Sequence, residues 1–417
     1  MKENTLFYKN SKLNSGMTKF ILFFFIFFSV NSYAQWNTVF SGETTPFNGS
    51  YTLNPTTAYV VADYGKCYKT TNSGFSWFPN NPGNSYTLYS IAFVNDLNGI
   101  ITASNGRYFL TDNGGTSWGE YNTGSVFPVY SVKYWNANKF AMCGDTGMIR
   151  VYTNGGLSGQ YNGTKGFHSV TFLDSMNILA VGLYGAVTKS TNSGVSFINL
   201  NSGTANNLYS VSFVNNLTGF AAGSYGTIIK TTNGGNNWVS QTSGTNLWLY
   251  GISFTSANSG YVCGEQGKLM KTVNGGTTWV SQVSNSVQEL RSIAVRTDNL
   301  GYCVGVNGTV LKTTNGGATF INQTSSDIPE KYYISQNFPN PFNPDTKINF
   351  AVKESSIVRI DVYNSQGKVT ATLTDQRMQP GSYNVVFDGS ALSSGTYKYR
   401  MTLNGITADT KRMIFLK

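Results

Sequence analysis

Three acidic residues have the chemical type and the placement that a hydrolytic site would need. Asp63, Asp145 and Glu265 each lie two residues before a glycine, in stretches of sequence that resemble one another. Glycoside hydrolysis uses a pair of carboxyl groups beside the bond that is cut. The alternative is that these acids simply belong to turns. Because they come from widely separated repeats, we favour turn residues and assign no catalytic residue.

Other catalytic constellations are weaker still. A sialidase-like site needs three convergent arginines for the substrate carboxylate, but the available arginines fall at different positions of the repeat: Arg107, Arg150, Arg291 and Arg296. The single histidine, His168, occupies a position that tyrosine fills elsewhere, which favours a packing or channel role over a catalytic base. We find no serine nucleophile motif and no metal-ligand spacing. We expect no metal and no cofactor, and keep a glycoside hydrolase as the alternative function.

The element that positions these residues is a sequence repeat. An asparagine returns at nearly constant intervals, at Asn72, Asn113, Asn154, Asn192, Asn233, Asn274 and Asn315. The interval is 41 residues, except for 38 between Asn154 and Asn192, and a glycine follows two residues after each asparagine. A fixed period near forty residues is typical of a repeat architecture.

Each repeat unit contains four short segments with strand character, which we name A to D. In the fifth unit they are residues 208–214, 218–223, 226–232 and 237–242. Four strands in about forty residues, repeated seven times, predict an all-β fold with a seven-bladed β-propeller over residues 35–325. Leucine-rich and helical repeats are excluded because no 3.6-residue periodicity appears.

The recurring asparagine falls in the turn between strands C and D. Asparagine and glycine tolerate positive φ, and the asparagine side chain can bond back to the turn backbone. An aromatic residue follows the second glycine and begins strand D, at Trp77, Trp118, Phe197, Trp238, Trp279 and Phe320. Since a catalytic loop is needed only once, sevenfold recurrence predicts that the asparagines are structural turn residues.

These turns carry a family resemblance. The pattern Ser/Thr-x-Asn-x-Gly-x-x-aromatic resembles the Asp-box, or BNR, repeat of sialidases and sortilin-type propellers, and "GTIIKTTNGGNNW" resembles propellers related to the photosystem II assembly and stability factor. The resemblance covers about residues 36–324 and implies a propeller with its boxes at the blade periphery. Members usually carry aspartate where this chain has asparagine, so the boxes lack the charge that calcium binding favours. We do not carry the photosystem role over to an exported chain.

Two irregularities in the repeat predict special structure. Trp36 lies 41 residues before Trp77, so an extra D-like strand precedes the first unit and could join the first and last blades. The third unit departs from the pattern: Gly159 replaces the aromatic residue, Tyr152 replaces Ser/Thr, and three residues are missing before the next blade.

The candidate binding face carries the B–C turns and the D–A connections. Strand A opens there with one prominent residue per blade: Asn48, Tyr89, Tyr130, His168, Tyr209, Tyr250 and Arg291. The B–C turns add Tyr64, Tyr184, Tyr225 and Gln266. Aromatic and amide groups around a central mouth suit sugars or extended peptides. For the strand A residues we favour the alternative that they fill the channel and pack between blades; the turn residues stay undecided.

The two ends of the chain predict export. Residues 1–34 read as a signal peptide, with four lysines before the apolar run at 20–30 and small residues at 32–34. That run is too short to span a bilayer, and we expect no transmembrane segment. Residues 326–344 form a linker with a proline-rich entry, and alternating strands in residues 345–417 predict a small immunoglobulin-like sandwich.

The C-terminal region resembles the type A sorting domain of the type IX secretion system of Bacteroidetes and their relatives. The matching stretches are "QNFPNPFNPDT", "VYNSQGKV", "PGSYNVVFDG", "SSGTYKYRM" and "KRMIFLK", with Phe338 and Phe387 where tyrosine and tryptophan are commoner. The resemblance implies the secretion machinery as a partner. It also implies delivery to the cell surface or the medium, commonly with removal of the domain. An ordinary adhesive domain is the alternative.

Charge and cysteine content narrow the range of partners and covalent links that the sequence allows. Residues 35–325 hold fourteen Lys and Arg against ten acids, a net of +4 without a basic run, so we expect no nucleic-acid partner. The four cysteines are Cys67, Cys143, Cys263 and Cys303. Their spacing favours buried free thiols, with a Cys263–Cys303 bridge as the alternative. Together, the sequence predicts a secreted or surface-displayed, non-enzymatic binding propeller; a structural surface component is a further alternative.

Overall fold

The computed structural model describes residues 36–416, except 41, 162, 164, 283, 285, 315–320, 344, 390 and 391. The predicted signal peptide (residues 1–34), the seventh turn asparagine Asn315 and Phe320 lie outside the described residues. Strands dominate the described residues, and the only helical segments are short 3-10 turns: η1 (Asp145–Gly147), η2 (Leu183–Gly185), η3 (Ser224–Gly226) and η4 (Glu265–Gly267).

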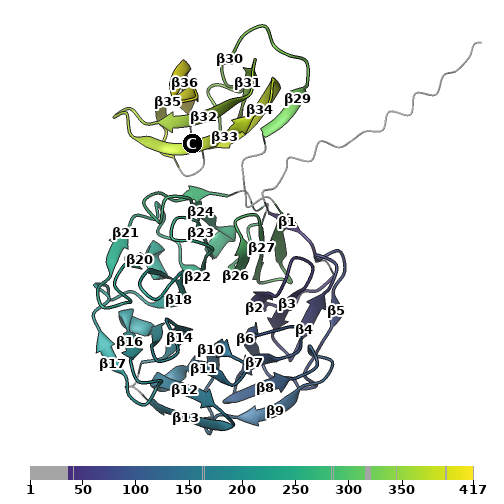
Figure 1. The fold of residues 1–417 in the computed structure, drawn as a ribbon, viewed down its shortest axis with the longest axis vertical. Helices are drawn as coiled ribbons and strands as arrows, with labels where there is room; N and C mark the ends of the chain where they lie inside the picture. Colours follow the sequence, from purple (N-terminus) through teal and green to yellow (C-terminus); the bar gives the residue numbers. More distant parts are fainter. Residues whose placement is uncertain are drawn as a thin grey trace, which may run out of the picture. The chain divides into compact units, whose positions relative to one another are not determined.

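Seven four-stranded antiparallel sheets form a ring around a central channel, with the first strand of each blade nearest the axis (Figure 1). Blade one consists of β2 (Phe47–Thr52), β3 (Ala58–Ala62), β4 (Cys67–Thr70) and β5 (Phe78–Pro79), and blade two of β6 (Leu88–Phe93), β7 (Gly99–Ala103), β8 (Arg107–Thr111) and β9 (Gly119–Asn122). Blade three consists of β10 (Val129–Asn136), β11 (Lys139–Gly144), β12 (Met148–Thr153) and β13 (Gly156–Tyr161). Blade four consists of β14 (Phe167–Phe172), β15 (Ile178–Gly182), β16 (Val187–Ser190) and β17 (Ile198–Leu200).

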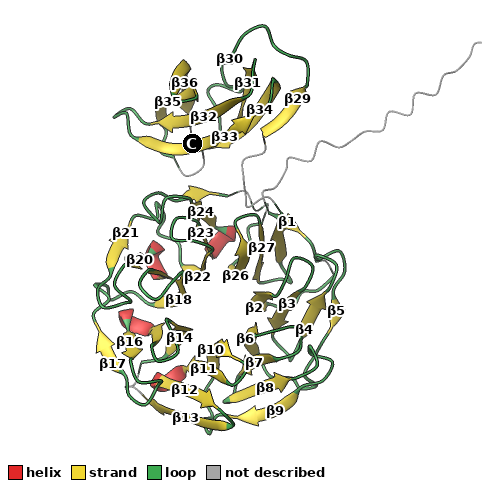
Figure 2. Ribbon diagram, in the orientation of Figure 1, coloured by secondary structure: helices red, strands yellow, loops and turns green. Residues whose placement is uncertain are grey.

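Blade five consists of β18 (Leu208–Phe213), β19 (Gly219–Gly223), β20 (Ile228–Thr231) and β21 (Val239–Gln241), and blade six of β22 (Leu249–Phe254), β23 (Gly260–Gly264), β24 (Leu269–Thr272) and β25 (Val280–Ser281). Blade seven consists of β26 (Leu290–Thr297), β27 (Leu300–Gly305), β28 (Val310–Thr313) and the N-terminal strand β1 (Asn37–Thr38). The predicted seven-bladed propeller is confirmed. Figure 2 shows the same ring with its strands in yellow.

The composition of each strand follows its distance from the axis. Second strands such as β3 and β19 are buried along their whole length, because neighbouring blades cover both of their faces. Such strands are short continuous runs of apolar and small residues. The outer strand β9, by contrast, is exposed at all of its residues. The hydrophobic core is therefore a series of clusters between adjacent blades.

The ring is closed by the strand that precedes the first repeat. In β1, Asn37 pairs with Lys312 and Thr38 with Leu311, so an N-terminal strand completes the last blade. Trp36 beside it is fully buried and meets Tyr261 of blade six edge-on, with ring centroids 5.8 Å apart. The extra strand predicted from the spacing of Trp36 therefore joins the two ends of the propeller.

Because β1 occupies the outer edge of blade seven, the segment after the last repeat is placed elsewhere. The repeat pattern assigned residues up to 325 to the propeller region. In the structure, β29 (Ile321–Ser325) instead pairs with β34 (Gly381–Asp388) in the C-terminal sheets. A propeller sheet has one outer edge, and β1 already takes its hydrogen bonds.

The small residues along the channel have a hydrogen-bonding role as well as a steric one. The hydroxyls of Ser131, Ser169 and Ser210 each accept the backbone N–H of a strand A residue in the next blade, at 3.2–3.3 Å. Ser292 of blade seven accepts the N–H of Ser50 in blade one at 3.2 Å. These bonds link four of the seven neighbouring pairs of inner strands: blades three to six in succession, and blade seven to blade one.

The turns between strands C and D are held by the box side chains. In the second blade, Asn113 Oδ1 accepts the N–H of Ser117 at 3.0 Å, and Asn113 Nδ2 donates to the Ser117 hydroxyl at 2.8 Å. Thr111 Oγ1 accepts the N–H of Gly115 at 2.9 Å. The same arrangement occurs around Asn72, Asn192 and Asn274, and Asn233 Oδ1 accepts the N–H of Asn237. In these five boxes the left-handed backbone falls on the residue after the asparagine, not on the asparagine.

The third blade replaces the box with a two-residue hairpin. Thr153 pairs with Gly156, and the turn residues Asn154 and Gly155 have φ of 48° and 90°. Positive φ at both central residues is the geometry of a tight β-hairpin. Gly159 takes the aromatic position because a Cβ there would lie 2.2 Å from the Ile149 carbonyl oxygen. The departures of the third repeat therefore reflect a different turn.

Lysines on the third strands link neighbouring blades. Lys230 of β20 donates to the Gly275 carbonyl in the next box at 2.9 Å, and its ammonium lies 5.2 Å from the ring centre of Phe220, its cross-strand partner. The same lysine-to-box hydrogen bond is made by Lys69, Lys189 and Lys312, with distances of 3.0, 2.9 and 2.6 Å. Since Lys312 reaches Ser73 of blade one, these links extend across the closure.

The C-terminal region forms two packed four-stranded sheets. One contains β29, β34, β31 (Asp345–Val352) and β30 (Tyr333–Ile334); the other contains β33 (Val369–Met378), β32 (Ser356–Tyr363), β35 (Gly395–Leu403) and β36 (Ile406–Phe415). Alternating residues of β31 and β35 are buried in one core, the pattern of a sandwich. Phe387 lies in this core, whereas Phe338 is exposed.

All four cysteines are buried free thiols. Burial raises the pKa of each of Cys67 and Cys143 above its ordinary value. The thiols of Cys263 and Cys303 are hydrogen-bonded to each other, and burial followed by that contact raises the pKa of Cys303. The bridge considered for Cys263 and Cys303 is absent, and the four side chains act as small hydrophobic groups.

Candidate functional site

A cavity of about 130 Å³ opens at the channel axis, between the inner strands of all seven blades. We name its rim the mouth ring, which consists of one residue from each blade: Asn48, Tyr89, Tyr130, His168, Tyr209, Tyr250 and Arg291. The structure therefore brings Tyr89, Tyr209, Tyr250 and Arg291 together, as the repeat register predicted.

The aromatic members of the mouth ring contact one another in sequence. Tyr130 stacks on His168 with ring centroids 4.8 Å apart and an interplanar angle of 16°. Edge contacts of 5.1 Å join Tyr89 to Tyr130 and of 5.4 Å join His168 to Tyr209. Tyr209 then meets Tyr250 at 5.2 Å. Packing around the ring holds these side chains at the mouth.

Polar contacts complete the circuit between Tyr250 and Tyr89. Arg291 Nε donates to Glu289 Oε1 at 2.8 Å, and Arg291 Nη1 donates to Asn48 Oδ1 at 2.7 Å. The Tyr250 hydroxyl donates to Glu289 Oε2 at 3.4 Å. Asn48 Nδ2 in turn donates to the carbonyl of Leu88, next to Tyr89. Arg291 is thus held by Glu289 of its own blade and by Asn48 of blade one.

The three acids singled out from the sequence, which we name the mouth acids, are each held by their own surroundings. Asp63 Oδ1 accepts Asn48 Nδ2 at 2.8 Å, Asp145 Oδ1 accepts the N–H of Thr146 at 2.8 Å, and Glu265 Oε2 accepts the N–H of Trp248 at 2.8 Å. Their hydrogen bonds fix the turns and connections of three different blades. No contact joins one of these acids to another within the described part of the chain.

The negative charges of nearby acids change the pKa values of side chains in the mouth ring. Burial first, and then the carboxylate of Asp145, raises the pKa of Tyr130 to about 12. Burial, then the charges of Glu289 and Glu265, raises the pKa of Tyr250. Burial lowers the pKa of His168 to about 4, although Asp145 acts to raise it. At neutral pH the ring tyrosines are therefore phenols and His168 is neutral.

The B–C turns explain the exposed residues of this face. The central non-glycine residue of each turn has φ between 52° and 58°: Tyr64, Asn105, Thr146, Tyr184, Tyr225, Gln266 and Asn307. Each is followed by a glycine whose backbone is also left-handed. At Gly226, an added Cβ would lie 1.8 Å from the carbonyl oxygen of Thr245 in the next connection. In six of the seven turns this first central residue is exposed to solvent, whereas Thr146 is partly buried.

The predicted turn residues do not all join the mouth ring. Tyr64, Tyr184 and Tyr225 are 71%, 65% and 65% exposed, and Gln266 is exposed as well. Tyr225 meets Trp248 edge-on at 6.1 Å, and Trp248 contacts Tyr209 at 5.9 Å. Tyr225 therefore extends the mouth ring outwards through Trp248. Tyr64 and Tyr184 stand at the tips of blades one and four.

Two residues of this surface were missed by the sequence analysis. Trp248 and Glu289 each come directly before the first residue of an inner strand, and their backbone carbonyls accept N–H groups from the B–C turns of their own blades. The register of the repeat places both at the same position of the D–A connection. A comparison of that position across blades would have revealed them.

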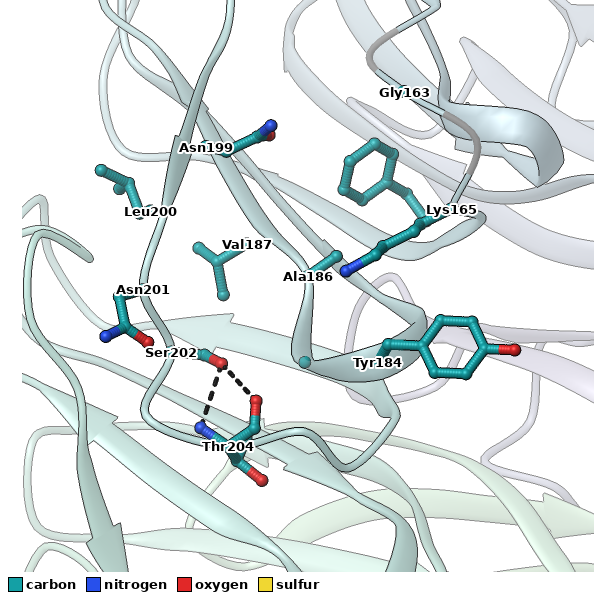
Figure 3. A pocket seen from close by; sticks show the side chains of 12 residues that line it. Gly163, Lys165, Tyr184, Ala186, Val187, Asn199, Leu200, Asn201, Ser202 and Thr204 are labelled. Carbon is teal, nitrogen blue, oxygen red and sulfur yellow. Dashed lines mark hydrogen bonds between the residues drawn. The ribbon is translucent and has the colours of Figure 1, made fainter.

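A second, larger cavity of about 360 Å³ lies beside Tyr184 in blade four. Figure 3 shows its walls: Asn199 to Ser202 line one side, and the Lys165 amine is directed toward Ala186. The Lys165 ammonium lies 5.9 Å from the Tyr184 ring centre. Ser202 and Thr204 are joined by two hydrogen bonds at the edge of this pocket (Figure 3). Its lining contains a lysine and no acid.

Comparison with known families assigns the propeller. Residues 26–232 and 231–329 match the family described as photosynthesis system II assembly factor YCF48. The chain belongs to this family. Residues 336–415 of this YCF48-like protein match the secretion system C-terminal sorting domain, so the chain carries an export tail that directs it to the cell surface or the extracellular space. The two resemblances stated from the sequence are confirmed.

Solved structures similar to the YCF48-like chain are propellers. YCF48 bound to a D1 peptide superposes with a TM-score of 0.59 at 17% identity, covering 68% of this chain and 96% of the other. YCF48 from Cyanidioschyzon merolae gives 0.56 at 16% identity, covering 67% and 98%. The WD40 propeller domain of Doa1 gives 0.56 at 10% identity, covering 66% and 96%. No curated protein matches the sequence.

Two further features of the YCF48-like protein concern metals and membranes. Among the described residues, no three His, Cys, Asp or Glu side chains are grouped as a metal ion would require. The part of the chain that the structure describes also contains no helix with the length and apolar character needed to cross a membrane.

Proposed function

We propose that this protein is an exported binding propeller that holds a partner at the mouth ring and the B–C turns around it, without turnover. The observation that carries the proposal is the axial cavity, which is lined by residues from every blade. Aromatic side chains at this rim are already ordered by their neighbours, so binding a partner would cost little further side-chain entropy.

A peptide partner is supported by the kind of surface and by one relative. Exposed tyrosines offer both an apolar face and a hydroxyl, as peptide-binding surfaces commonly do. A YCF48 propeller has been solved with a bound D1 peptide. A glycan partner uses the same side chains, and therefore belongs in the same screen.

The test is a binding screen of peptide and glycan libraries against the purified protein, repeated with single Tyr64→Ala, Tyr184→Ala and Tyr225→Ala variants. We expect Tyr225→Ala to weaken binding about tenfold or more, because it removes an exposed ring that packs on Trp248. Phe75→Ala is the matched control, since Phe75 is an exposed aromatic residue (91%) in a box at the opposite end of strand C. Affinity should be measured by titration calorimetry.

The same preparation should be assayed with a panel of glycosidase substrates. Turnover that disappears when Asp63, Asp145 or Glu265 is neutralised would contradict the proposal and favour the glycoside hydrolase. Tolerance of every face variant, together with an absence of ligands, would instead favour a structural surface component.

A further inference from the structure

The mouth ring carries an excess of negative charge. Four carboxylates contact or influence its members, those of Asp63, Asp145, Glu265 and Glu289, against the single guanidinium of Arg291. Over these five groups the formal charges sum to −3. The protein as a whole is basic, with a formal net charge of +10. The charged groups that act on the mouth ring therefore have a summed charge opposite in sign to the net charge of the whole chain.

The mouth acids have no counter-ion of their own. Each accepts a hydrogen bond from a neutral donor, and within the described residues none forms an ion pair. Two of the three basic residues that follow turn glycines form ion pairs with other acids: Lys66 pairs with Glu43 at 2.9 Å and Arg107 with Glu120 at 3.3 Å. A partner that supplied positive charge would therefore meet carboxylates that are not yet compensated.

The surface between these acids is aromatic. Glu265 holds the backbone of Trp248, whose ring contacts Tyr209, Tyr225 and Tyr250 at centroid distances of 5.9, 6.1 and 6.3 Å. Aromatic faces attract cations through their quadrupole, and a planar guanidinium also stacks on them. Carboxylates next to aromatic faces favour a large organic cation over an anionic or neutral ligand.

The chain itself shows how this rim accommodates a guanidinium. In blade seven, Arg291 takes the position that tyrosine fills in four other blades, and it is held by Glu289 and Asn48 at 2.8 and 2.7 Å. A small hard cation is a poorer match, because such ions need several oxygens converging at short range. The mouth acids lie instead in three separate blades, each with its own local hydrogen bond.

We infer that the mouth ring recognises an arginine side chain of a peptide partner, seated on the Tyr209, Tyr225 and Trp248 surface beside Glu265. The inference rests on the proposed binding function and adds the charge of the partner to it. Electrostatic attraction would bring basic segments to the mouth, and stacking on the aromatic rings would retain them.

The experiment compares peptides that differ in charge but little in shape. Gly-Ser peptides carrying arginine at three positions are titrated by calorimetry into the full protein, next to peptides with citrulline or glutamate at the same positions. Citrulline keeps the planar side chain and removes the charge. We expect the arginine peptide to bind at least about tenfold more tightly than the citrulline peptide, and this preference to weaken as salt is raised.

Variants assign the preference to the mouth acids. Glu265→Gln is expected to reduce the arginine-to-citrulline ratio to about threefold, and adding Asp63→Asn and Asp145→Asn to reduce it to about one. The control is Asp112→Asn, which removes an exposed acid in a box at the opposite end of strand C. Unfolding midpoints measured for each variant separate a loss of recognition from a loss of folding.

The outcomes distinguish this inference from the proposed function. Equal binding of the arginine and citrulline peptides, or a preference that survives in the triple variant, overturns the inference. If neutral peptides or glycans bind and are lost in Tyr225→Ala, the proposed function stands while the inference fails. If no peptide or glycan binds at millimolar concentration, both fail.

Discussion

His168 illustrates how the channel environment sets the behaviour of a single side chain. Its imidazole stacks on Tyr130 and lies at 5.4 Å from Tyr209, in a position that is tyrosine in four other blades. Burial lowers the pKa of His168 to about 4, against an ordinary value of 6.5. The residue that sequence reasoning weighed as a catalytic base is therefore a neutral member of the mouth ring at physiological pH.

The lowered pKa of His168 predicts a loss of stability in acid. Between the unfolded value of 6.5 and the folded value of about 4, the unfolded chain binds more protons, so stability falls as pH falls through this range. The His168 contribution at about pH 5 should be about 2 kcal/mol lower than at neutral pH. Urea unfolding at the two pH values measures it.

The His168→Tyr variant is the control for this prediction. Tyrosine restores the residue of the neighbouring blades and does not titrate in this range, so the variant should lose less stability on acidification by about the same amount. Equal acid sensitivity in the two proteins would show that other groups, such as the carboxylate of Glu43, dominate the pH dependence.

At the scale of the element, the two kinds of repeated turn have different roles: the C–D boxes stabilise the blades, and the B–C turns expose side chains. The C–D boxes are satisfied internally, because the asparagine oxygen accepts a turn N–H and its amide donates to a following hydroxyl at 2.7–2.9 Å. An ionised aspartate has no such donor, and this difference explains physically why asparagine suits these boxes. The B–C turns, by contrast, place one side chain in solvent and leave it available to a partner.

Lys230 provides a test of the links between blades. Lys230→Met keeps most of the aliphatic chain but removes the donor to the Gly275 carbonyl and the cation beside Phe220. We expect the free energy of unfolding to fall by about 1–2 kcal/mol, because a carbonyl at the blade interface loses its partner. Chemical denaturation measures it, with the exposed Lys368→Met in the C-terminal sheets as the control. A loss no larger than that of the control would mean that water replaces the amine at no cost.

At the scale of the molecule, joining the first and last blades of a propeller covers a sheet edge that would otherwise be unpaired. Here the N-terminal strand β1 supplies the outer strand of blade seven, and the segment that follows it is anchored to blade one. Glu43 in that segment accepts hydrogen bonds from the Tyr68 hydroxyl at 2.6 Å and from Lys66 at 2.9 Å. Burial alone would raise the pKa of Glu43, but these bonds and those from Thr45 hold it well below its usual range.

Trp36 tests the importance of this closure. Trp36→Ala empties a fully buried site against Tyr261, so unfolding should become easier by about 3–5 kcal/mol and limited proteolysis should cut first near the N-terminus. Trp135→Ala is the matched control, because Trp135 is 43% exposed on an inner strand. Similar protease resistance in the two variants would argue against β1 as the element that holds the ring together.

The repeat itself could be predicted because its signals are local. The turn from Asn113 to Ser117 is formed by residues four apart, and the left-handed turn at Tyr225 is followed by a glycine that is visible in the sequence. Strand order within each blade follows from such turns. The mouth ring could be predicted for the same reason, since equivalent positions of identical units must meet at the axis.

The remaining features depend on contacts between distant residues. The repeat register gives the position of Trp248 in the D–A connection, but its contacts with Tyr225 and Tyr209 depend on the packing of two blades. The strand Ile321–Ser325 continues the sequence repeat, yet it pairs with β34 because β1 already occupies the edge of blade seven. Competition between two strands for one edge cannot be decided from periodicity.

By itself, the amino-acid sequence determined the number of blades, the position of each turn and the presence of an export tail, because all three are written in short, repeated or continuous motifs. Only the tertiary structure decided which strand completes the ring, which acids stay without a counter-ion, and how Arg291 meets Asn48 across 243 positions of the chain. The physical reason is that hydrogen bonds and charges act through space, and ring closure brings the two ends of the repeat array together.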